Sequence, residues 1–227
     1  MNPIINTHQI HPVGDSAVLI QLGDQIDLEI NSLVHALAQV LMKNAPQGMG
    51  EAVPAYTTVL LHYDPLCLSY SMVKSWIDDC YLRLTKNTNR KENLIKIPTV
   101  YGERFGPDLE DVARLNNLTV SEVIRLHSAV EYPVYMMGFT PGFPYLGGMD
   151  TRLSTPRLET PRKAVRAGSV GIAGSQTGIY SITSPGGWRI IGCTPLVLFD
   201  PQRETPFLIN PGDRLRFIPI SAQEAGL

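Results

Sequence analysis

The sequence is poor in cysteine and in net charge, and each shortage excludes a class of protein. Its 227 residues include three cysteines, Cys67, Cys80 and Cys193, and no CxxC pair, which excludes a disulfide framework and a cysteine-based zinc module. We therefore expect free, buried thiols that pack as small hydrophobic side chains. The formal net charge of -2 provides no overall field that would attract nucleic acid or an anionic membrane.

Long apolar runs are absent as well. No stretch approaches the roughly 18 residues of a membrane span, and the polar start MNPIINTHQIHPVGD has no signal-peptide core. We therefore expect a cytoplasmic protein without membrane contact. The content of 44% hydrophobic and 18% charged residues is typical of a globular protein with an ordinary core.

Glycine and proline are scarce in the first part of the chain and frequent in the second. Residues 133–227 hold 13 of the 19 glycines and 11 of the 18 prolines. The polar stretch KNTNRKEN offers a boundary between two domains. We expect an N-terminal domain over residues 1–92 and a second domain over residues 93–227.

The first half of the chain predicts alternating strands and helices. β-Branched and apolar runs predict strands, and apolar residues at helical spacing predict two helices, the first capped by Asp27. In chain order these are strand 17–22, helix 28–41, strands 53–55 and 57–63, helix 70–84 and strand 94–100. The order β-α-β-β-α-β is that of the split βαβ, ferredoxin-like unit, although other α+β sandwiches share it.

A helical segment over residues 108–130 opens the second half. Within it, Thr119 and Glu122 have the spacing of a capping box, in which each side chain bonds a free backbone amide at the helix start. After Pro133, short apolar runs alternate with Gly/Pro turns, which is typical of a closed β-barrel or a β-sandwich. These runs cover residues 134–137, 170–173, 188–191, 196–199 and 215–219.

The stretch GFTPGFPYLGG, residues 138–148, is the most unusual segment. Its glycines, Gly142 among them, allow the backbone to approach a ligand closely, and its prolines stiffen the loop. Phe139, Phe143 and Tyr145 would form an apolar wall. The alternative is a rigid aromatic turn that only closes one end of a barrel.

A basic segment follows, in which residues 152–166 carry five cations and one carboxylate. Arg157 and Arg162 each follow a proline, which fixes the local backbone. A guanidinium group binds a carboxylate or a phosphate through two parallel hydrogen bonds. The segment therefore indicates either an anion site or an ordinary solvated surface.

The glycine-rich run AGSVGIAGSQTGIY, residues 167–180, combines strand-forming residues with hydroxyl side chains. A backbone nest for an anion is one expectation for it. It is not a P-loop, because GxxxxGK[ST] occurs nowhere in the chain, and it does not match the dinucleotide-binding GxGxxG pattern. The SPGGW segment that follows predicts a tight turn with Trp188 in the core.

Histidine is scarce, with five in the chain. His8 and His11 lie in the polar start, where their spacing is a weak metal signal, and we expect no metal site. His127 lies on the apolar face of the second expected helix of the 108–130 segment. That position suits a hydrogen-bonded core residue, or a general base near the loop at residues 138–148, which we call the Gly138 loop.

Long motifs over nearly the whole chain resemble the KipI / allophanate hydrolase subunit 1 family. They include PVGDSAVLI near the start, YGERFGPDLEDVA and LHSAVEYPVYMMGF in the middle, and GFTPGFPYLGG, AGSVGIAGSQTGIY, SPGGW and PGDRLRF in the second half. The chain departs from the family pattern at Arg166, Ser181 and Cys193, which bears on fine substrate preference.

The resemblance implies an N-terminal α+β domain and a C-terminal cyclophilin-like closed β-barrel without prolyl-isomerase activity. Together with the element order, the expected fold class is α+β, a ferredoxin-like α/β sandwich followed by that barrel. The resemblance also implies a larger partner of the allophanate hydrolase subunit 2 type. In many bacteria this pair and a third protein form 5-oxoprolinase, which converts 5-oxo-L-proline to L-glutamate with ATP.

On this hypothesis the chain is inactive alone and binds 5-oxoproline and ATP together with its larger partner. Arg157 or Arg162 would hold the carboxylate or a phosphate, and His127 is a candidate for proton handling. The remaining contacts expected are Phe139, Gly142, Phe143 and Trp188 as the apolar wall and Ser169, Gln176, Thr177 and Tyr180 as hydrogen-bonding groups. Two alternatives stay open, namely an inhibitor of a sensor histidine kinase and a subunit that processes urea or allophanate.

Overall fold

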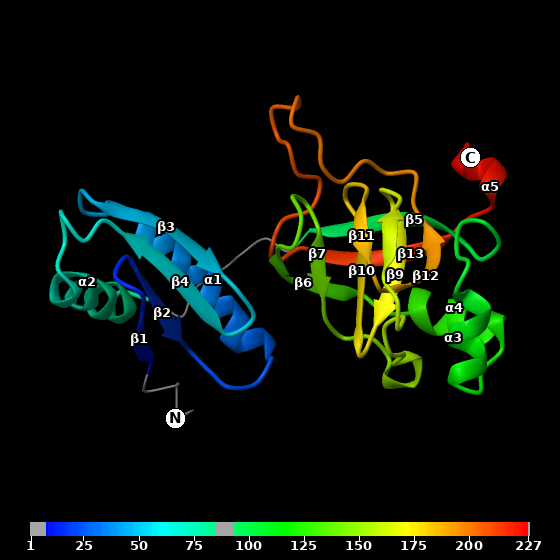
Figure 1. Cartoon of the computed structure of the whole chain (residues 1–227), viewed down its shortest axis with the longest axis horizontal. Coiled ribbons are helices and arrows are strands. Elements are labelled where there is room, and N and C mark those ends of the chain that lie inside the picture. The colour runs from blue at the N-terminus through cyan, green and yellow to red at the C-terminus, as the bar shows by residue number, and fades with distance from the viewer. Residues whose placement is uncertain (1–7, 85–92, 227) are drawn as a thin grey trace. The chain divides into compact units, whose positions relative to one another are not determined.

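The computed structural model describes residues 8–84 and 93–226, and the chain divides into two compact units, Met1–Arg90 and Lys91–Leu227 (Figure 1). The predicted domain boundary, after residue 92, falls at the end of a segment that lies outside the described residues. Each unit has a buried core of its own.

The N-terminal unit is a four-stranded antiparallel sheet, in the order β1-β2-β4-β3, with two helices packed on it. Leu37 of one helix and Ile77 of the other share a buried cluster with Ile20 and Leu61 of the sheet, so both helices lie on the same face. The elements are β1 (Gln9–Val13), β2 (Ala17–Gln21), α1 (Leu28–Met42), β3 (Met49–Pro54), β4 (Thr58–Tyr63) and α2 (Tyr70–Leu82). As predicted, the Asp27 carboxylate caps α1 by accepting two backbone N–H groups.

One strand was not expected from the sequence, and another was assigned to the wrong sheet. The start of the chain contains the edge strand β1, which pairs with β2 although it carries Pro12 and little apolar character. The strand expected to complete the N-terminal sheet, residues 94–100, belongs instead to the barrel. Because β2 and β3 both run antiparallel to β4 and lie on either side of it, the split βαβ arrangement is still present.

The second unit is a closed barrel with the strand order β10-β7-β6-β13-β5-β12-β9, which confirms the predicted fold class. The parallel pair β5–β13 joins distant parts of the chain, since Leu94 lies opposite Arg214. Its strands are β5 (Leu94–Tyr101), β6 (Tyr132–Met137), β7 (Pro144–Leu146), β9 (Ser169–Ala173), β10 (Gln176–Ile179), β12 (Arg189–Cys193) and β13 (Arg214–Pro219). The strand expected at 196–199 is absent apart from an isolated bridge between Phe199 and Phe207.

Smaller elements surround the barrel. A two-stranded ribbon pairs β8 (Arg162–Val165) with β11 (Ser184–Gly186). The helical elements are α3 (Leu109–Leu115), α4 (Val120–Ser128), the 3-10 turn η1 (Thr151–Leu153) and α5 (Ala222–Ala225). The predicted capping box is confirmed, because Thr119 and Glu122 bond each other's backbone amides at the start of α4.

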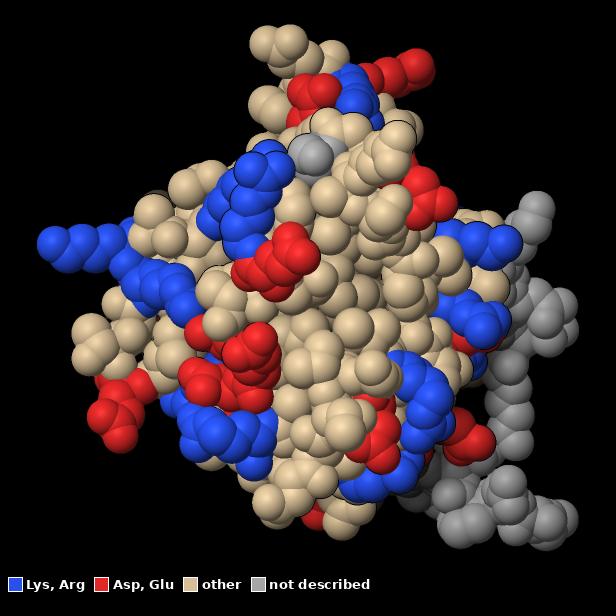
Figure 2. All heavy atoms as spheres, turned by 90° about the vertical axis from the view of Figure 1, so that its right-hand side faces the viewer, with Lys and Arg blue, Asp and Glu red and all other residues tan. Residues whose placement is uncertain are grey.

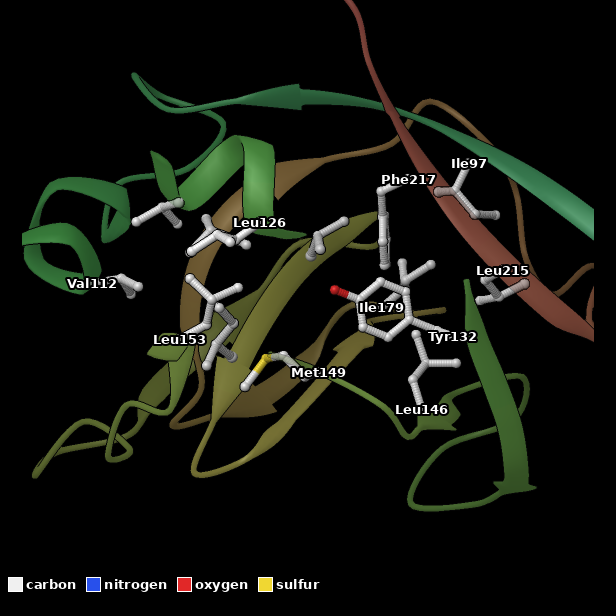
Figure 3. Packing of buried hydrophobic residues seen from close by; sticks show 14 of the residues in the cluster. Ile97, Val112, Leu126, Tyr132, Leu146, Met149, Leu153, Ile179, Leu215 and Phe217 are labelled. Carbon is white, nitrogen blue, oxygen red and sulfur yellow. The ribbon is translucent and has the colours of Figure 1, made fainter. Parts of the chain in front are cut away.

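The main cluster of buried hydrophobic side chains fills the barrel core, and the Tyr132 side chain lies within it (Figure 3). Leu126 of α4 and Leu153 of η1 close one side, while Ile97, Leu215 and Phe217 come from the β5–β13 pair. Complete burial of these side chains stabilises the barrel by about 1.5–3 kcal/mol each. The core therefore fixes the strands on which the surface hollows are built.

Charged groups of both signs are interspersed on the barrel face shown in Figure 2. Three surface ion pairs are Arg114 with Asp111, Arg152 with Asp150, and Arg203 with Asp200. This mixture agrees with the small net charge and provides no broad basic surface. Among the described residues, no helix is long and apolar enough to cross a membrane.

Candidate functional site

A hollow lined mainly by aromatic side chains lies on the second unit, with a volume of about 350 Å³. This size is within the usual range of small-molecule sites. We call it the aromatic hollow. Its lining residues are Phe139, Phe143, Tyr145, Arg157, Pro161, Tyr180, Pro185, Gly186, Gly187 and Trp188.

The Gly138 loop shapes one side of this hollow by turning tightly between β6 and β7. Gly142 has a φ of 80°, and a Cβ there would lie 2.9 Å from that of Phe199, so only glycine fits. Phe139 also has a positive φ, 63°, which is a strained conformation for a bulky residue, and its side chain is 63% exposed. The loop therefore presents Phe139 outward while Phe143 is buried.

The aromatic rings in the wall interlock edge to face. The Phe143 ring lies 5.4 Å from Trp188 at 87° and 5.5 Å from Tyr180 at 86°. Edge-to-face contacts of this kind contribute about 0.5–1.5 kcal/mol each beyond burial. The wall is thus rigid and apolar, and it offers ring edges and faces to a small flat molecule.

Two polar groups face this apolar surface. Burial raises the pKa of Tyr180. The hydrogen bond that its oxygen accepts from the Trp188 backbone N–H, and the positive charges of Arg157 and Arg162, lower this pKa by a smaller amount. The Tyr180 hydroxyl is therefore protonated at neutral pH and can donate a hydrogen bond. Arg157 supplies a positive charge, and within the described chain it has no ion-pair partner, unlike Arg152 and Arg162.

Arg162 lies elsewhere, at a second hollow of about 170 Å³ that we call the arginine hollow. Its guanidinium group donates to the Asp108 carboxylate at 2.7 Å, and the other Asp108 oxygen accepts the Ile190 backbone N–H at 2.6 Å. Ser169 lines this hollow too. The full lining is Arg104, Phe105, Pro107, Arg162, Ala164, Val165, Arg166, Ser169, Ile190 and Cys193.

The two hollows share a wall. Val165 and Ile190 line the arginine hollow and also belong to the buried cluster that contains Phe143, Tyr180 and Trp188 of the aromatic hollow. Of the two arginines predicted to bind an anion, Arg157 lines the aromatic hollow and Arg162 lines the arginine hollow, although the charges of both act on Tyr180. Within residues 167–180, where a backbone nest was one expectation, β9 and β10 form an antiparallel hairpin.

His127 is completely buried among aromatic side chains of the barrel and lines neither hollow. Its Nδ1 lies 2.7 Å from the Tyr101 hydroxyl, and its Nε2 lies 2.8 Å from Thr177 Oγ1. Because the Thr177 hydroxyl donates to the Gly171 carbonyl, Nε2 carries the proton and Nδ1 accepts one from Tyr101. Burial lowers the pKa of His127 to about 3, so the ring is neutral at physiological pH.

The structure therefore groups the predicted site residues into three sets. Phe139, Phe143, Arg157, Tyr180 and Trp188 line the aromatic hollow, with Gly142 in the loop that shapes it. Arg162 and Ser169 line the arginine hollow. His127 and Thr177 form a closed hydrogen-bonded pair in the core, and Gln176 of β10 lines neither hollow.

The cysteines differ in their exposure. Cys80 and Cys193 are buried as expected, but Cys67 is exposed. The Asp64 carboxylate accepts a hydrogen bond from the Cys67 thiol and raises its pKa. No cluster of metal-ligating side chains occurs in the part of the chain that the structure describes.

Comparison with known proteins identifies the family of the chain. The model of the carboxyltransferase domain, subdomain C and D, matches residues 8–209. The chain belongs to this family. A 5-oxoprolinase subunit of Bacillus subtilis is 42% identical over 96% of the chain and 95% of its own length, which confirms the resemblance drawn from the motifs.

Two further proteins are similar to the chain over most of its length. A conserved uncharacterized protein of Pyrococcus horikoshii, PH0987, is 52% identical over 95% of this chain and 99% of its own, with a TM-score of 0.57. The urea amidolyase of Lachancea kluyveri is 26% identical over 93% of this chain, which covers only 13% of that longer protein. The fold thus occurs both as a separate chain and as one part of a large enzyme.

For this carboxyltransferase-family chain, reasoning from sequence missed two site residues. Asp108 looks like the start of a helix in the sequence, but its carboxylate makes no cap bond and instead orients Arg162. Arg104 lies in a turn next to Phe105, with its guanidinium group 4.7 Å from the centre of that ring. The only signal was their place in the motif YGERFGPDLEDVA.

Proposed function

We propose that the chain is a subunit of an ATP-dependent 5-oxoprolinase complex and that its aromatic hollow binds the lactam 5-oxo-L-proline. The name and near-complete coverage of the Bacillus subtilis relative support the first part. The observation that carries the second part is the Arg157 guanidinium group, which has no ion-pair partner among residues 8–84 and 93–226 and lies at an apolar hollow of suitable volume. 5-Oxoproline has the matching features, a flat ring and a single carboxylate.

The binding mode follows from the wall. The ring lies against Phe143 and Trp188, the carboxylate takes the bidentate hydrogen bonds of Arg157, and the Tyr180 hydroxyl donates to a substrate oxygen. The apolar walls exclude water, which strengthens each of these polar contacts. A molecule without a carboxylate would leave Arg157 unpaired and would bind less tightly.

In this proposal ATP is a co-substrate of the whole complex. The lactam oxygen attacks the γ-phosphorus and ADP leaves, which makes the ring carbon electrophilic. Water then adds to that carbon, and the C–N bond breaks as the nitrogen takes up a proton, which gives γ-glutamyl phosphate. A second water hydrolyses this acyl phosphate to glutamate and inorganic phosphate. The chain contributes binding and orientation, and it is inactive without the larger subunit of the allophanate hydrolase subunit 2 type and the third oxoprolinase protein.

The exposed side chain of Phe139 at the hollow indicates where a partner subunit would contact this chain. Isolated exposed hydrophobic residues are common, but this one is held outward by a strained backbone. A partner covering Phe139 would also close the hollow over the substrate. The complex would then hold the nucleotide opposite the lactam.

The test is steady-state kinetics of the reconstituted complex with Arg157→Gln. We expect the KM for 5-oxoproline to rise at least tenfold, as about 1.5–3 kcal/mol is typical of a hydrogen bond to a charged group. Arg152→Gln is the matched control, because Arg152 is paired with Asp150 outside the hollow and should leave KM unchanged. An unchanged KM in Arg157→Gln would refute this assignment.

A second candidate substrate class is supported by the urea amidolyase relative. Urea-derived amides either lack a carboxylate or have it at a different place from 5-oxoproline, so their contact with Arg157 would differ. Assaying the same reconstituted complex with 5-oxoproline, urea and allophanate separates the two. Turnover of a urea-derived amide, with none of 5-oxoproline, would favour the alternative.

A further inference from the structure

The arginine hollow has more positive charge than its own side chains neutralise. Three guanidinium groups line it, those of Arg104, Arg162 and Arg166. Asp108, directly behind the lining, is 5% exposed and pairs with Arg162. In the described part of the chain neither Arg104 nor Arg166 makes an ion pair, so two positive charges remain.

Arg162 is held in a fixed direction. Its Nη2 donates to Asp108 at 2.7 Å and its Nη1 lies 3.4 Å from the Trp188 carbonyl. A guanidinium group has five N–H donors, so these two contacts leave three for a ligand in the hollow that Arg162 lines. A tethered donor loses little side-chain entropy when it binds an anion.

The neutral lining also suits an anion. Ser169 is buried, yet its hydroxyl makes no hydrogen bond to any described residue, so it can donate into the hollow. Burial raises the pKa of the Cys193 thiol, which therefore adds no negative charge. Phe105 and Ile190 give the floor an apolar character, which strengthens the field of the arginines.

The size of the hollow limits its ligand. Its volume of about 170 Å³ equals that of roughly five or six water molecules at ~30 Å³ each. A tetrahedral oxyanion fits in this space, whereas a nucleoside does not. Several arginines around a small concavity are the usual recognition chemistry for phosphate, through charge-assisted hydrogen bonds.

We propose that the arginine hollow is a phosphate site, distinct from the aromatic hollow and separated from it by the shared wall of Val165 and Ile190. Arg104, Arg162 and Arg166 bind the oxyanion, and Ser169 donates a neutral hydrogen bond. The ligand is either inorganic phosphate or the terminal phosphate of a nucleotide whose remainder lies outside. It is not the phosphate that the lactam in the aromatic hollow attacks, because the shared wall lies between them. Either way, occupation of the site acts on the same wall that supports Tyr180 and Trp188.

The experiment is calorimetric titration of the full-length chain alone with inorganic phosphate at low ionic strength. We expect saturable 1:1 binding that Arg104→Gln and Arg166→Gln each weaken at least tenfold. Arg157→Gln, in the aromatic hollow, and Arg114→Gln, an exposed arginine paired with Asp111, are the matched controls and should not change it. Arg162 is left intact because its removal would leave the buried Asp108 unpaired.

Titration with ATP, ADP and adenosine distinguishes the two sources of phosphate. Tighter binding of ATP than of inorganic phosphate, lost in Arg166→Gln, would assign the terminal phosphate of a nucleotide, and the reverse order would assign free phosphate. Absence of saturable binding, or equal loss in Arg157→Gln, would overturn the proposal. The measurement needs neither partner subunits nor 5-oxoproline, so its failure is independent of the proposed function.

Discussion

The barrel interior and the aromatic hollow both contain polar groups among aromatic rings, but the two regions differ in how these groups are paired. In the interior, His127 is hydrogen-bonded through both ring nitrogens and is shielded from solvent. In the hollow, Arg157 has no ion-pair partner within the described residues, and the Tyr180 hydroxyl keeps a proton to donate. Fully paired buried polar groups maintain a fold, whereas unpaired ones at a concave surface are available to a ligand.

Removal of His127 should have the largest effect on stability and should show that its role is structural. His127→Ala leaves the Tyr101 and Thr177 hydroxyls without their partner and opens a cavity, so we expect a loss of about 3–5 kcal/mol in the free energy of unfolding. Chemical denaturation measures it. His62→Ala, at an exposed position on β4, is the control and should change stability by less than about 0.5 kcal/mol.

The same comparison predicts a pH dependence. The pKa of His127 is about 3 in the folded chain and close to 6.5 when unfolded, so below pH 6.5 the unfolded state binds the extra proton. The contribution of the neutral ring is complete above pH 6.5 and should fall by about 1.4 kcal/mol per pH unit down to about pH 3. Unfolding curves of the wild type and of His127→Gln at several pH values would reveal it. Equal slopes for the two proteins would contradict the assignment.

An added methyl group at the wall of the aromatic hollow should lower stability by less than the loss of His127 does, and by an amount that depends on its position. A Cβ at Gly186 would overlap the Tyr180 hydroxyl, whereas a Cβ at Gly187 would lie 3.5 Å from Pro161, an ordinary contact. We expect Gly186→Ala to cost about 1–3 kcal/mol in stability and to displace Tyr180. Gly187→Ala is the matched control and should be close to neutral. Thermal unfolding of the two variants tests this difference.

Local signals in the sequence were sufficient for the four longer helices, α1 to α4. The Thr119 capping box and the Asp27 cap were identified correctly, because each depends on residues a few positions apart. Pairings between distant segments were not predictable. The edge strand β1 has a weak pattern, and its position is defined by β2 rather than by its own residues.

Contacts between distant residues were not predictable in the candidate site either. The Asp108 carboxylate binds the backbone amide of Ile190, 82 positions further along the chain, and thereby fixes Arg162 at the arginine hollow. Periodicity and composition contain no information about this contact. Nor did the sequence indicate that Arg157 and Arg162, which each follow a proline, line different hollows.

A structure of the assembled complex with 5-oxo-L-proline bound would test the central claim most directly. The account predicts the lactam ring against Phe143 and Trp188, with its carboxylate on the Arg157 guanidinium group. A ligand bound away from the aromatic hollow, with Arg157 still facing solvent, would contradict it.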